Sequence, residues 1–501
     1  MQTPCEIVSV NPATRAELGR VGVATELEVQ AAVRRARQVQ SDWGALSFGE
    51  RAAFILRAKT ILVEAQEEIC DLISRETGKP AVEAMTSEVF PAANLMDYFA
   101  RNARKQLRPE QFTLSVFRNK KSRISYQPLG VVGIISPWNF PFSIPMGGVV
   151  MGLISGNAVL LKPSEMTPLS GLRIAELFRA AGLPDGVLTV LTGDGETGRG
   201  LVQAGIDKIF FTGSVRTGRQ IAQAAAARLM PCVLELGGKD AMIVCADAPF
   251  ERATNGALWG AFNNCGQACA SVERLYVVEE IADRFIQAVV QRVRLLRVGV
   301  DGAQQQDVGP LNNERQLQVV IEHVNDAIAQ GARALTGGRP VNGLNGCFYE
   351  PTVLVGVTPS MRVLQEETFG PVLPIMVVKD EAAAIREANR SRFGLLASVW
   401  TKDTKRGQKI AAQLEAGTVI INDVVYTHAA AETPWFGIKE SGLGITHSKH
   451  GLREFAQMKH INWDLFPLKT NPWWFPYSAK QRARFNLLSK ILHRWDLKRW
   501  I

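Results

Sequence analysis

The sequence lacks the marks of several classes of protein. Its seven cysteines are scattered and form no Cys-x-x-Cys pair, which argues against a disulfide framework or a zinc cluster and is typical of a reducing compartment. No apolar run approaches the roughly 18 residues that a membrane-spanning helix needs. The first residues have neither the basic nor the apolar segment of a signal peptide. We therefore expect a cytoplasmic protein without a bound metal.

The composition is that of a large globular protein. Of its 501 residues, 46% are hydrophobic and 21% are charged, which allows an extended core and excludes a disordered chain. The 24 prolines and 43 glycines are close to average usage, which excludes collagen-like and low-complexity chains. The length predicts two to four domains.

The positive charge is concentrated in a C-terminal extension, residues 466–501. The chain has 57 basic and 48 acidic residues, and the extension holds eight of the bases and one of the acids. The remainder is therefore nearly neutral. Because nucleic-acid-binding proteins carry their basic surface on the folded domain, we expect no nucleic-acid partner.

The extension has the pattern of an amphipathic helix. Leu488, Leu492 and Trp495 follow Phe485 at three, seven and ten residues, which places all four on one helical face, with basic residues around them. A basic amphipathic helix with tryptophans is typical of peripheral membrane binding, here through residues 473–501 at the inner membrane face. An arm that packs across an oligomer and covers the entrance to the site is an equally open interpretation.

The hydrophobic pattern predicts an α/β fold. Residues 25–105 are predicted to be helical because their apolar residues recur at spacings of three and four. From about residue 124, short β-branched runs alternate with helical stretches, which predicts a mostly parallel sheet with helices on both faces. A second α/β stretch covers 238–425. The predicted strands are 131–135, 158–162, 187–191, 208–212 and 233–236, and then about 241–245, 275–279, 373–378, 397–401 and 418–421.

Three residues stand in contexts that suit acyl chemistry. Cys269 lies in a glycine-containing loop, where a carbonyl can reach the sulfur and backbone N–H groups can hold an oxyanion. Glu235 ends an apolar strand, where burial would raise its pKa and make it a general base. Asn139 follows the first strand of the sheet and has an amide that can donate to an oxyanion. Taken singly, each has an ordinary interpretation as a buried thiol, a surface residue before a turn or a helix cap.

Six motifs make the chain resemble the aldehyde dehydrogenase superfamily over roughly residues 8–462. They are Pro-Trp-Asn-Phe-Pro at 137–141, Lys-Pro-Ser-Glu at 162–165, Phe-Thr-Gly-Ser-x-x-x-Gly at 211–218, Glu-Leu-Gly-Gly-Lys at 235–239, Phe-x-Asn-x-Gly-Gln-x-Cys at 262–269 and Glu-Glu-Thr-Phe-Gly-Pro-Val at 366–372.

The resemblance implies two Rossmann-like parallel-sheet domains and a small β oligomerisation element, and hence a homodimer or homotetramer. The implied parts are an NAD-binding domain of residues 1–114 and 128–236, a catalytic domain of 237–430, an oligomerisation element of 115–127 and 431–465, and the extension 466–501.

The resemblance also implies a reaction sequence. Cys269 attacks the aldehyde carbon, and the oxyanion is held by the Asn139 side chain and the Cys269 backbone N–H. Hydride then passes to the nicotinamide, and Glu235 activates the water that hydrolyses the thioester. We expect Cys265 to be a packed thiol, with a reversible disulfide to Cys269 as the alternative.

For the cofactor, the resemblance implies NAD, with NADP as the alternative. The Glu165 carboxylate would bond a free 2′-hydroxyl and repel a 2′-phosphate, which favours NAD. The segment 193–198 satisfies Gly-x-Gly-x-x-Gly, yet the resemblance places the pyrophosphate at Gly213–Gly218, beside a helix N-terminus. The implied cofactor-binding residues are Ser136, Trp138, Lys162, Glu165, Gly195, Gly213, Ser214, Gly218, Leu236, Glu367 and Phe369.

Two departures from the family pattern bear on the substrate. Relatives often have a bulky aromatic residue and then Lys where this chain has Gly147 and Gly148, and those specific for succinate semialdehyde tend to have Arg at the first position. The usual Gly-Arg-Glu is here Gly-Ile-Thr446, followed by His447, which leaves the proton-relay route open.

We therefore expect a wide, uncharged tunnel and a hydrophobic aldehyde, either medium- or long-chain or aromatic. A semialdehyde dehydrogenase and a catalytically silent scaffold of the same fold are the alternatives. A CoA-acylating enzyme is disfavoured because the water-activating Glu235 is retained.

Overall fold

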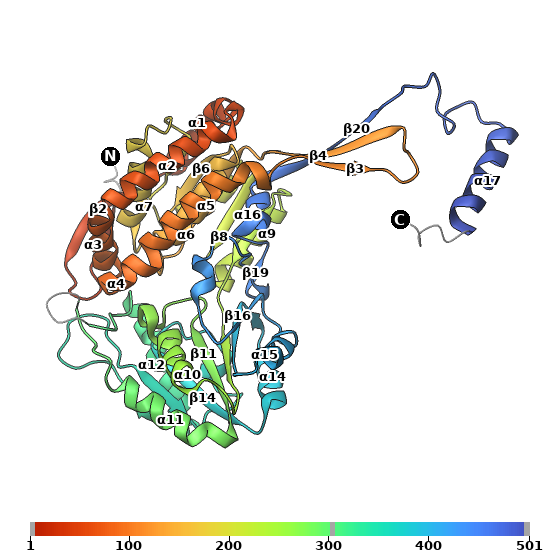
Figure 1. The fold of residues 1–501 in the computed structure, drawn as a ribbon. Coiled ribbons are helices and arrows are strands. Elements are labelled where there is room, and N and C mark those ends of the chain that lie inside the picture. The colour runs from red at the N-terminus through yellow and green to blue at the C-terminus, as the bar shows by residue number, and fades with distance from the viewer. Residues whose placement is uncertain (1–5, 301–305, 495–501) are drawn as a thin grey trace. The chain divides into compact units, whose positions relative to one another are not determined.

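The computed structural model describes residues 6–300 and 306–494 (Figure 1). It divides into two compact units. The larger contains the residues up to Arg108 together with Tyr126–Gln457, and the smaller contains Pro109–Ser125 and the residues from Met458 onward.

A six-stranded sheet forms the first half of the larger unit. Its strand order is β19-β9-β8-β5-β6-β7, parallel except for β19, which runs antiparallel to β9. The register aligns Ile135 with Lys162 and Thr212 with Glu235, so the carboxyl ends of β5, β6, β8 and β9 meet at one edge. The strands are β5 (Val131–Ile135), β6 (Ala158–Lys162), β7 (Leu188–Val190), β8 (Lys208–Thr212), β9 (Cys232–Glu235) and β19 (Gly442–Leu443).

Helices cover both faces of this sheet because successive strand residues point to opposite sides. Val132, Ile134 and Val159 face a core shared with α2, α5, α6 and α7, whereas Val131 and Leu160 face a core shared with α1, α8 and α9. In Figure 1, α2, α5 and α6 run side by side. The helices are α1 (Glu26–Ala45), α2 (Phe48–Glu64), α3 (Gln66–Thr77), α5 (Phe90–Gln106), α6 (Ser143–Ile154), α7 (Pro168–Ala180), α8 (Gly195–Gln203) and α9 (Val215–Ala226).

A seven-stranded sheet forms the second half of the larger unit, in the order β12-β13-β14-β11-β10-β16-β17, with only β12 antiparallel. Sequence analysis missed β12 and β13. The strands are β10 (Asp240–Val244), β11 (Val272–Val278), β12 (Arg333–Thr336), β13 (Thr352–Val355), β14 (Val372–Val378), β16 (Leu396–Trp400) and β17 (Thr418–Ile421). The helices are α10 (Phe250–Phe262), α11 (Glu279–Val293), α12 (Glu314–Ala329), α14 (Glu381–Asn389) and α15 (Thr404–Ala411).

Short elements complete the larger unit. They are β1 (Glu6–Val10), β2 (Glu17–Gly22), α4 (Ala81–Ala84), the π-helix η1 (Met85–Val89), the 3₁₀ turns η2 (Asn263–Gly266) and η3 (Tyr426–Ala429), α13 (Arg362–Gln365), β15 (Phe393–Gly394), β18 (Ile438–Lys439) and α16 (Ser448–Glu454). The α/β fold with two largely parallel sheets is confirmed.

The smaller unit contains most of a three-stranded sheet in the order β20-β4-β3 and the helix α17. Lys120 forms an ion pair with Asp464 (2.6 Å), and Ser122 bonds His460 (2.6 Å), which ties β4 to the end of β20. The elements are β3 (Glu110–Thr113), β4 (Lys120–Pro128), β20 (Ala456–Asp464) and α17 (Ala479–Arg494).

Residues 431–457, expected in the oligomerisation element, belong to the larger unit, because β19 pairs with β9 and Trp435 packs against Leu395 and Leu396. Trp495 lies outside the described residues. Within 6–300 and 306–494, no helix combines the length and the apolar character that crossing a bilayer requires.

Candidate active site

The loop that carries Cys269 has an unusual backbone. Asn264, Cys265 and Gly266 have φ values of 50°, 57° and 71°, three consecutive residues in the left-handed region. A Cβ on Gly266 would lie 2.1 Å from the carbonyl oxygen of Gly370, so only glycine fits there. The backbone N–H of Asn264 donates to both oxygens of the Glu83 carboxylate, at 3.0 and 3.1 Å. These contacts fix the approach to Cys269.

Cys269 is partly buried among acidic groups. Burial raises the pKa of its thiol, and the carboxylates of Asp240, Glu235 and Glu367 raise it further. The protein alone therefore favours the neutral thiol. Cys265, in contrast, is a buried free thiol packed in the core of the second sheet.

Asn139 is held against the same loop. Its side-chain Nδ2 donates to the carbonyl of Gln267 (3.0 Å), so it is not a helix cap. Its own carbonyl accepts hydrogen bonds from Lys79 Nζ (2.8 Å) and Asn264 Nδ2 (3.0 Å). Lys79 in turn forms a fully buried ion pair with Glu88 (2.7 Å). One amide hydrogen of Asn139 remains for a ligand.

Glu235 ends β9 inside the protein, not on its surface. Its residue is 6% exposed, and burial raises its pKa well above the ordinary value, with the Trp435 indole offsetting part of the shift. Neither carboxylate oxygen accepts a hydrogen bond of normal geometry from the described residues. A buried carboxyl without donors is suited to accept a proton from a neighbouring water.

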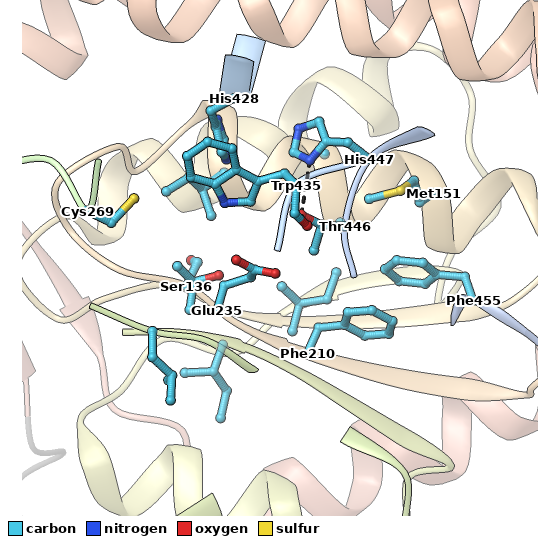
Figure 2. Close-up of a pocket in the computed structure, with 17 residues that line it drawn as sticks. Ser136, Met151, Phe210, Glu235, Cys269, His428, Trp435, Thr446, His447 and Phe455 are labelled. Carbon is cyan, nitrogen blue, oxygen red and sulfur yellow. Dashed lines mark hydrogen bonds between the residues drawn. The ribbon is translucent and has the colours of Figure 1, made fainter. Parts of the chain in front are cut away.

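Cys269 and Glu235 line one pocket (Figure 2). Figure 2 places Cys269 at one end, Phe210 and Phe455 at the other, and the Glu235 carboxylate between them. The lining residues come from β5, α6, β8, β9, the Cys269 loop, η3 and the segment after it, and include no lysine or arginine. They are Ile134, Ile135, Ser136, Ile144, Gly147, Gly148, Met151, Phe210, Thr212, Glu235, Leu236, Cys269, His428, Trp435, Thr446, His447 and Phe455.

Sequence analysis did not predict roles for His428 and Trp435 and noted His447 only as a neighbour of an altered motif. No local pattern marks these side chains. The histidine rings lie 4.8 Å apart between centroids, and the His428 and Trp435 rings 5.2 Å apart, from positions separated along the chain. Contact across such separations is decided by the fold.

The implied cofactor residues gather along the carboxyl edge of the first sheet. Ser136 follows β5, and Lys162 ends β6 with its Nζ 3.2 Å from Glu165. Gly213 follows β8, and Ser214 caps α9 by accepting from the Thr217 N–H. The glycine turn and the N-terminus of α9 therefore lie at the edge where phosphates bind in such folds.

Two glycines among these residues allow close packing. A Cβ on Gly213 would lie 2.6 Å from the ring of Phe211, and one on Gly218 would lie 2.5 Å from Leu236. At the start of α8, where Gly195 stands, Asp194 already accepts from two backbone N–H groups. The Gly-x-Gly-x-x-Gly segment therefore runs into a helix whose first N–H groups are already bonded within the protein.

The segment around Phe369 faces this edge from the second sheet. Glu273 accepts the backbone N–H groups of Thr368 and Phe369, both at 2.8 Å, and holds Phe369 at φ 50°. The Phe369 ring meets Trp138 edge-on at 5.5 Å. Glu367 accepts from the Gly238 N–H (3.0 Å), and burial raises its pKa. The chemistry of these residues fits a nucleotide cofactor at this sheet edge.

The comparisons with known proteins agree with this geometry. Residues 2–461 match the model of the aldehyde dehydrogenase family. The chain belongs to the aldehyde dehydrogenase family. It is accordingly an NAD(P)-dependent oxidoreductase.

Two curated relatives of this aldehyde dehydrogenase differ in their named substrates. It is 39% identical to a 4,4'-diapolycopene aldehyde oxidase of Methylomonas sp, over 96% of this chain and 90% of the relative. It is 38% identical to a putative succinate-semialdehyde dehydrogenase [NADP(+)] 2 of Mycobacterium ulcerans, over 89% of this chain and 86% of the relative.

The solved structures confirm the fold. A Mycobacterium tuberculosis aldehyde dehydrogenase complexed with NAD+ matches with a TM-score of 0.89 at 36% identity, covering 94% of this chain and 96% of that one. An E. coli NADP dependent enzyme matches with a TM-score of 0.89 at 35% identity, covering 92% of this chain and 95% of that one.

Proposed function

We propose that this aldehyde dehydrogenase oxidises long, apolar aldehydes to carboxylic acids with NAD. The observation that carries the proposal is the pocket beside Cys269, whose walls are mostly apolar and lack lysine and arginine. Gly147 and Gly148 add no side chain to its α6 wall, which Ile144 and Met151 complete. The relative named for the aldehyde of 4,4'-diapolycopene supports an apolar substrate.

The chain's residues divide the proposed reaction between them. The Cys269 sulfur bonds to the aldehyde carbon. The resulting oxyanion accepts hydrogen bonds from the Asn139 side-chain amide and from the Cys269 backbone N–H. A nicotinamide dinucleotide held by Gly213, Ser214 and Phe369 would supply the acceptor for the hydride of that carbon, and its positive charge would favour the Cys269 thiolate. Glu235 then removes a proton from the water that attacks the thioester, and the Cys269 thiolate leaves.

A semialdehyde dehydrogenase is the second candidate because several relatives have that name. A dicarboxylic semialdehyde needs a cation for its carboxylate, and the pocket lining offers none. We expect NADH formation from decanal with a larger kcat/KM than from succinate semialdehyde, and no CoA requirement. A preference for succinate semialdehyde would overturn the apolar substrate, and acyl-CoA as the product would overturn hydrolysis by Glu235.

The proposed choice of NAD rests on Glu165, whose side chain is 40% exposed at the end of β6. Glu165→Ser removes a carboxylate that opposes a 2′-phosphate. The ratio of NADP to NAD efficiency should rise by about tenfold, since such a clash is worth over about 1 kcal/mol. Kinetics with both cofactors measure this, and a wild-type preference for NADP would contradict it.

We propose a homodimer or homotetramer paired through the smaller unit's sheet. Strand β20 lies at the edge of this sheet and exposes a row of its residues, among them Met458 (58%) and Trp463 (42%), more apolar surface than an edge strand usually leaves in water. Sedimentation at micromolar concentration should give a dimer or tetramer. A monomer would refute the proposal.

We further propose that the C-terminal extension binds an anionic membrane surface. In α17 the side chains of Phe485, Leu488 and Leu492 are 38–42% exposed, and Trp474 and Phe475 before it are 52% and 77% exposed. The match to the Methylomonas relative spans 481 of 501 residues, so it includes part of the 36-residue extension. The family model ends at residue 461, so the alignment with that relative continues beyond it into the extension.

Vesicle binding tests this role. The full chain should bind vesicles containing phosphatidylserine, and its affinity should fall as the salt concentration rises. Each basic residue near the surface should contribute about 1 kcal/mol to the binding free energy. Deleting residues 467–501 should abolish binding and leave oxidation of a short aldehyde unchanged. A variant with Lys480, Arg482, Arg484 and Lys490 changed to Ser should bind weakly. If the deletion instead alters the oligomer mass, the extension is an oligomer arm.

A further inference from the structure

The pocket continues past Glu235 to a pair of histidines, and this pair has no role in the reaction as described so far. We propose that His447 and His428 carry to solvent the proton that Glu235 takes from the hydrolytic water. The proposal rests on the role proposed above for Glu235.

The need for such a route follows from burial. Glu235 is 6% exposed, and none of the described residues completes a hydrogen bond to its carboxylate. A proton accepted there must leave before the next turnover. Besides Glu235, the titratable residues that line the pocket are Cys269, His428 and His447. Cys269 holds the acyl group until the C–S bond breaks, so the histidines are the titratable lining residues that can carry the proton while the water attacks.

The histidines form a line of contacts that begins inside the pocket. In Figure 2 the Thr446 side chain lies between the Glu235 carboxylate and the His447 ring. Thr446 Oγ1 lies 3.0 Å from His447 Nδ1 and donates to the carbonyl of Trp435 at 3.3 Å. His447 is 4% exposed, and its Nε2 has no hydrogen-bond partner among the described residues. It is therefore a buried ring with one nitrogen available.

The line ends near the surface. The rings of His447 and His428 lie 4.8 Å apart between centroids, at 65° to one another. His428, in the turn η3, is partly exposed. The second ring can therefore exchange with solvent while the first faces the pocket.

The chemistry suits neutral imidazoles. Burial lowers the pKa of His428 to about 4, and burial together with His428 lowers that of His447 further. A neutral ring takes a proton on one nitrogen and releases one from the other, so neither ring stays charged. The water loses one proton to Glu235, its oxygen bonds to the acyl carbon, and the C–S bond breaks. The proton passes from Glu235 to His447, then to His428 and to solvent, which restores every group.

The test separates acyl formation from acyl release. His447→Phe and His428→Phe keep an aromatic ring and remove its nitrogens, and His450→Phe, an exposed neighbour on α16, is the matched control. With NAD and propanal, the His447 and His428 variants should keep a burst of NADH of about one per site. Their steady-state rate should fall at least tenfold. Added imidazole should restore much of that rate and leave the wild-type enzyme unaffected.

Three results would overturn the proposal. They are an unchanged steady-state rate in both variants, a lost burst, or a slow rate that imidazole does not restore. His447 has φ 59° and ψ 172°, a conformation that glycine adopts most readily, so His447→Gly replaces His447→Phe if that variant does not fold. Propanal makes the test independent of chain length. Poor oxidation of decanal together with a normal imidazole effect would count against the apolar substrate alone.

Discussion

The two ends of the pocket are built by different means. At the Cys269 end, the reacting groups stand on backbone fixed by hydrogen bonds, such as those from the Asn264 N–H to the Glu83 carboxylate and from Lys79 Nζ to the Asn139 carbonyl. At the Phe455 end, apolar side chains pack around the pocket, and the rings of Phe210 and Phe455 stack at 3.7 Å. Bond formation needs the reacting atoms to be held to within a fraction of an ångström. An apolar substrate chain needs only enough space and apolar walls that exclude water.

This difference predicts that changes at the Cys269 end cost activity with every aldehyde. Changes at the Phe455 end should alter which aldehyde is preferred. The following experiments test that division, beginning with the largest expected effect.

Cys269→Ala should lower NADH formation from any aldehyde at least a thousandfold, because Cys269 is the one thiol among the described residues that line the pocket. Binding of NAD, measured by quenching of tryptophan fluorescence, should be unchanged. Cys265→Ala is the control, since Cys265 is packed in the core of the second sheet, and it should stay active. Wild-type turnover in Cys269→Ala would refute the assignment of the nucleophile.

Glu235→Gln should slow the hydrolysis of the thioester by about a hundredfold or more while the first turnover proceeds. Rapid mixing should show a burst of NADH of about one per site and then a slow steady state. Because glutamine fills the same volume, the melting temperature should change little. A variant that loses the burst as well would show that Glu235 acts before the hydride step.

The pH dependence should follow the same residue. Burial raises the pKa of Glu235 well above its ordinary value, and only the ionised carboxylate accepts a proton. The steady-state rate should therefore keep rising with pH above the range in which an ordinary glutamic acid titrates. Glu235→Gln should lose this rise in the hydrolytic step. A wild-type rate that is flat from pH 6 to 9 in that step would contradict the raised pKa.

Gly147→Leu tests the other side of the comparison and has the smallest expected effect. A Cβ at Gly147 would meet only Leu95, at 3.5 Å, so a larger side chain extends into the pocket. The kcat/KM for decanal should fall about three- to tenfold, and that for propanal should change less than twofold. An equal loss for both aldehydes would show that α6 positions the reacting groups and does not shape the substrate path.

Much of the fold was predictable because it depends on local patterns. The predicted strands 131–135, 158–162 and 208–212 have the bounds of β5, β6 and β8. Continuous buried β-branched runs between amphipathic helices allow little else than a parallel sheet. The strands β12 and β13 were missed because β12 is half exposed at the sheet edge and long loops separate both from their neighbours.

The candidate site divides in the same way. Cys269, Glu235 and Asn139 were predicted because each stands in a recognisable motif, and the motifs follow one another in order. The depth at which Glu235 is buried, and the carboxylates around Cys269, came only from the structure. Burial and electrostatic environment depend on residues that are distant along the chain.

Local patterns in the sequence therefore predicted most strands of the two sheets, the family resemblance and the candidate reacting residues. The tertiary structure alone decided that His428, Trp435, Thr446 and His447 share a pocket with Glu235. The physical reason is that periodicity and turn chemistry act over a few residues. A pocket, in contrast, is closed by side chains that meet only when the β19 segment pairs with β9 and brings the histidines beside the buried carboxyl.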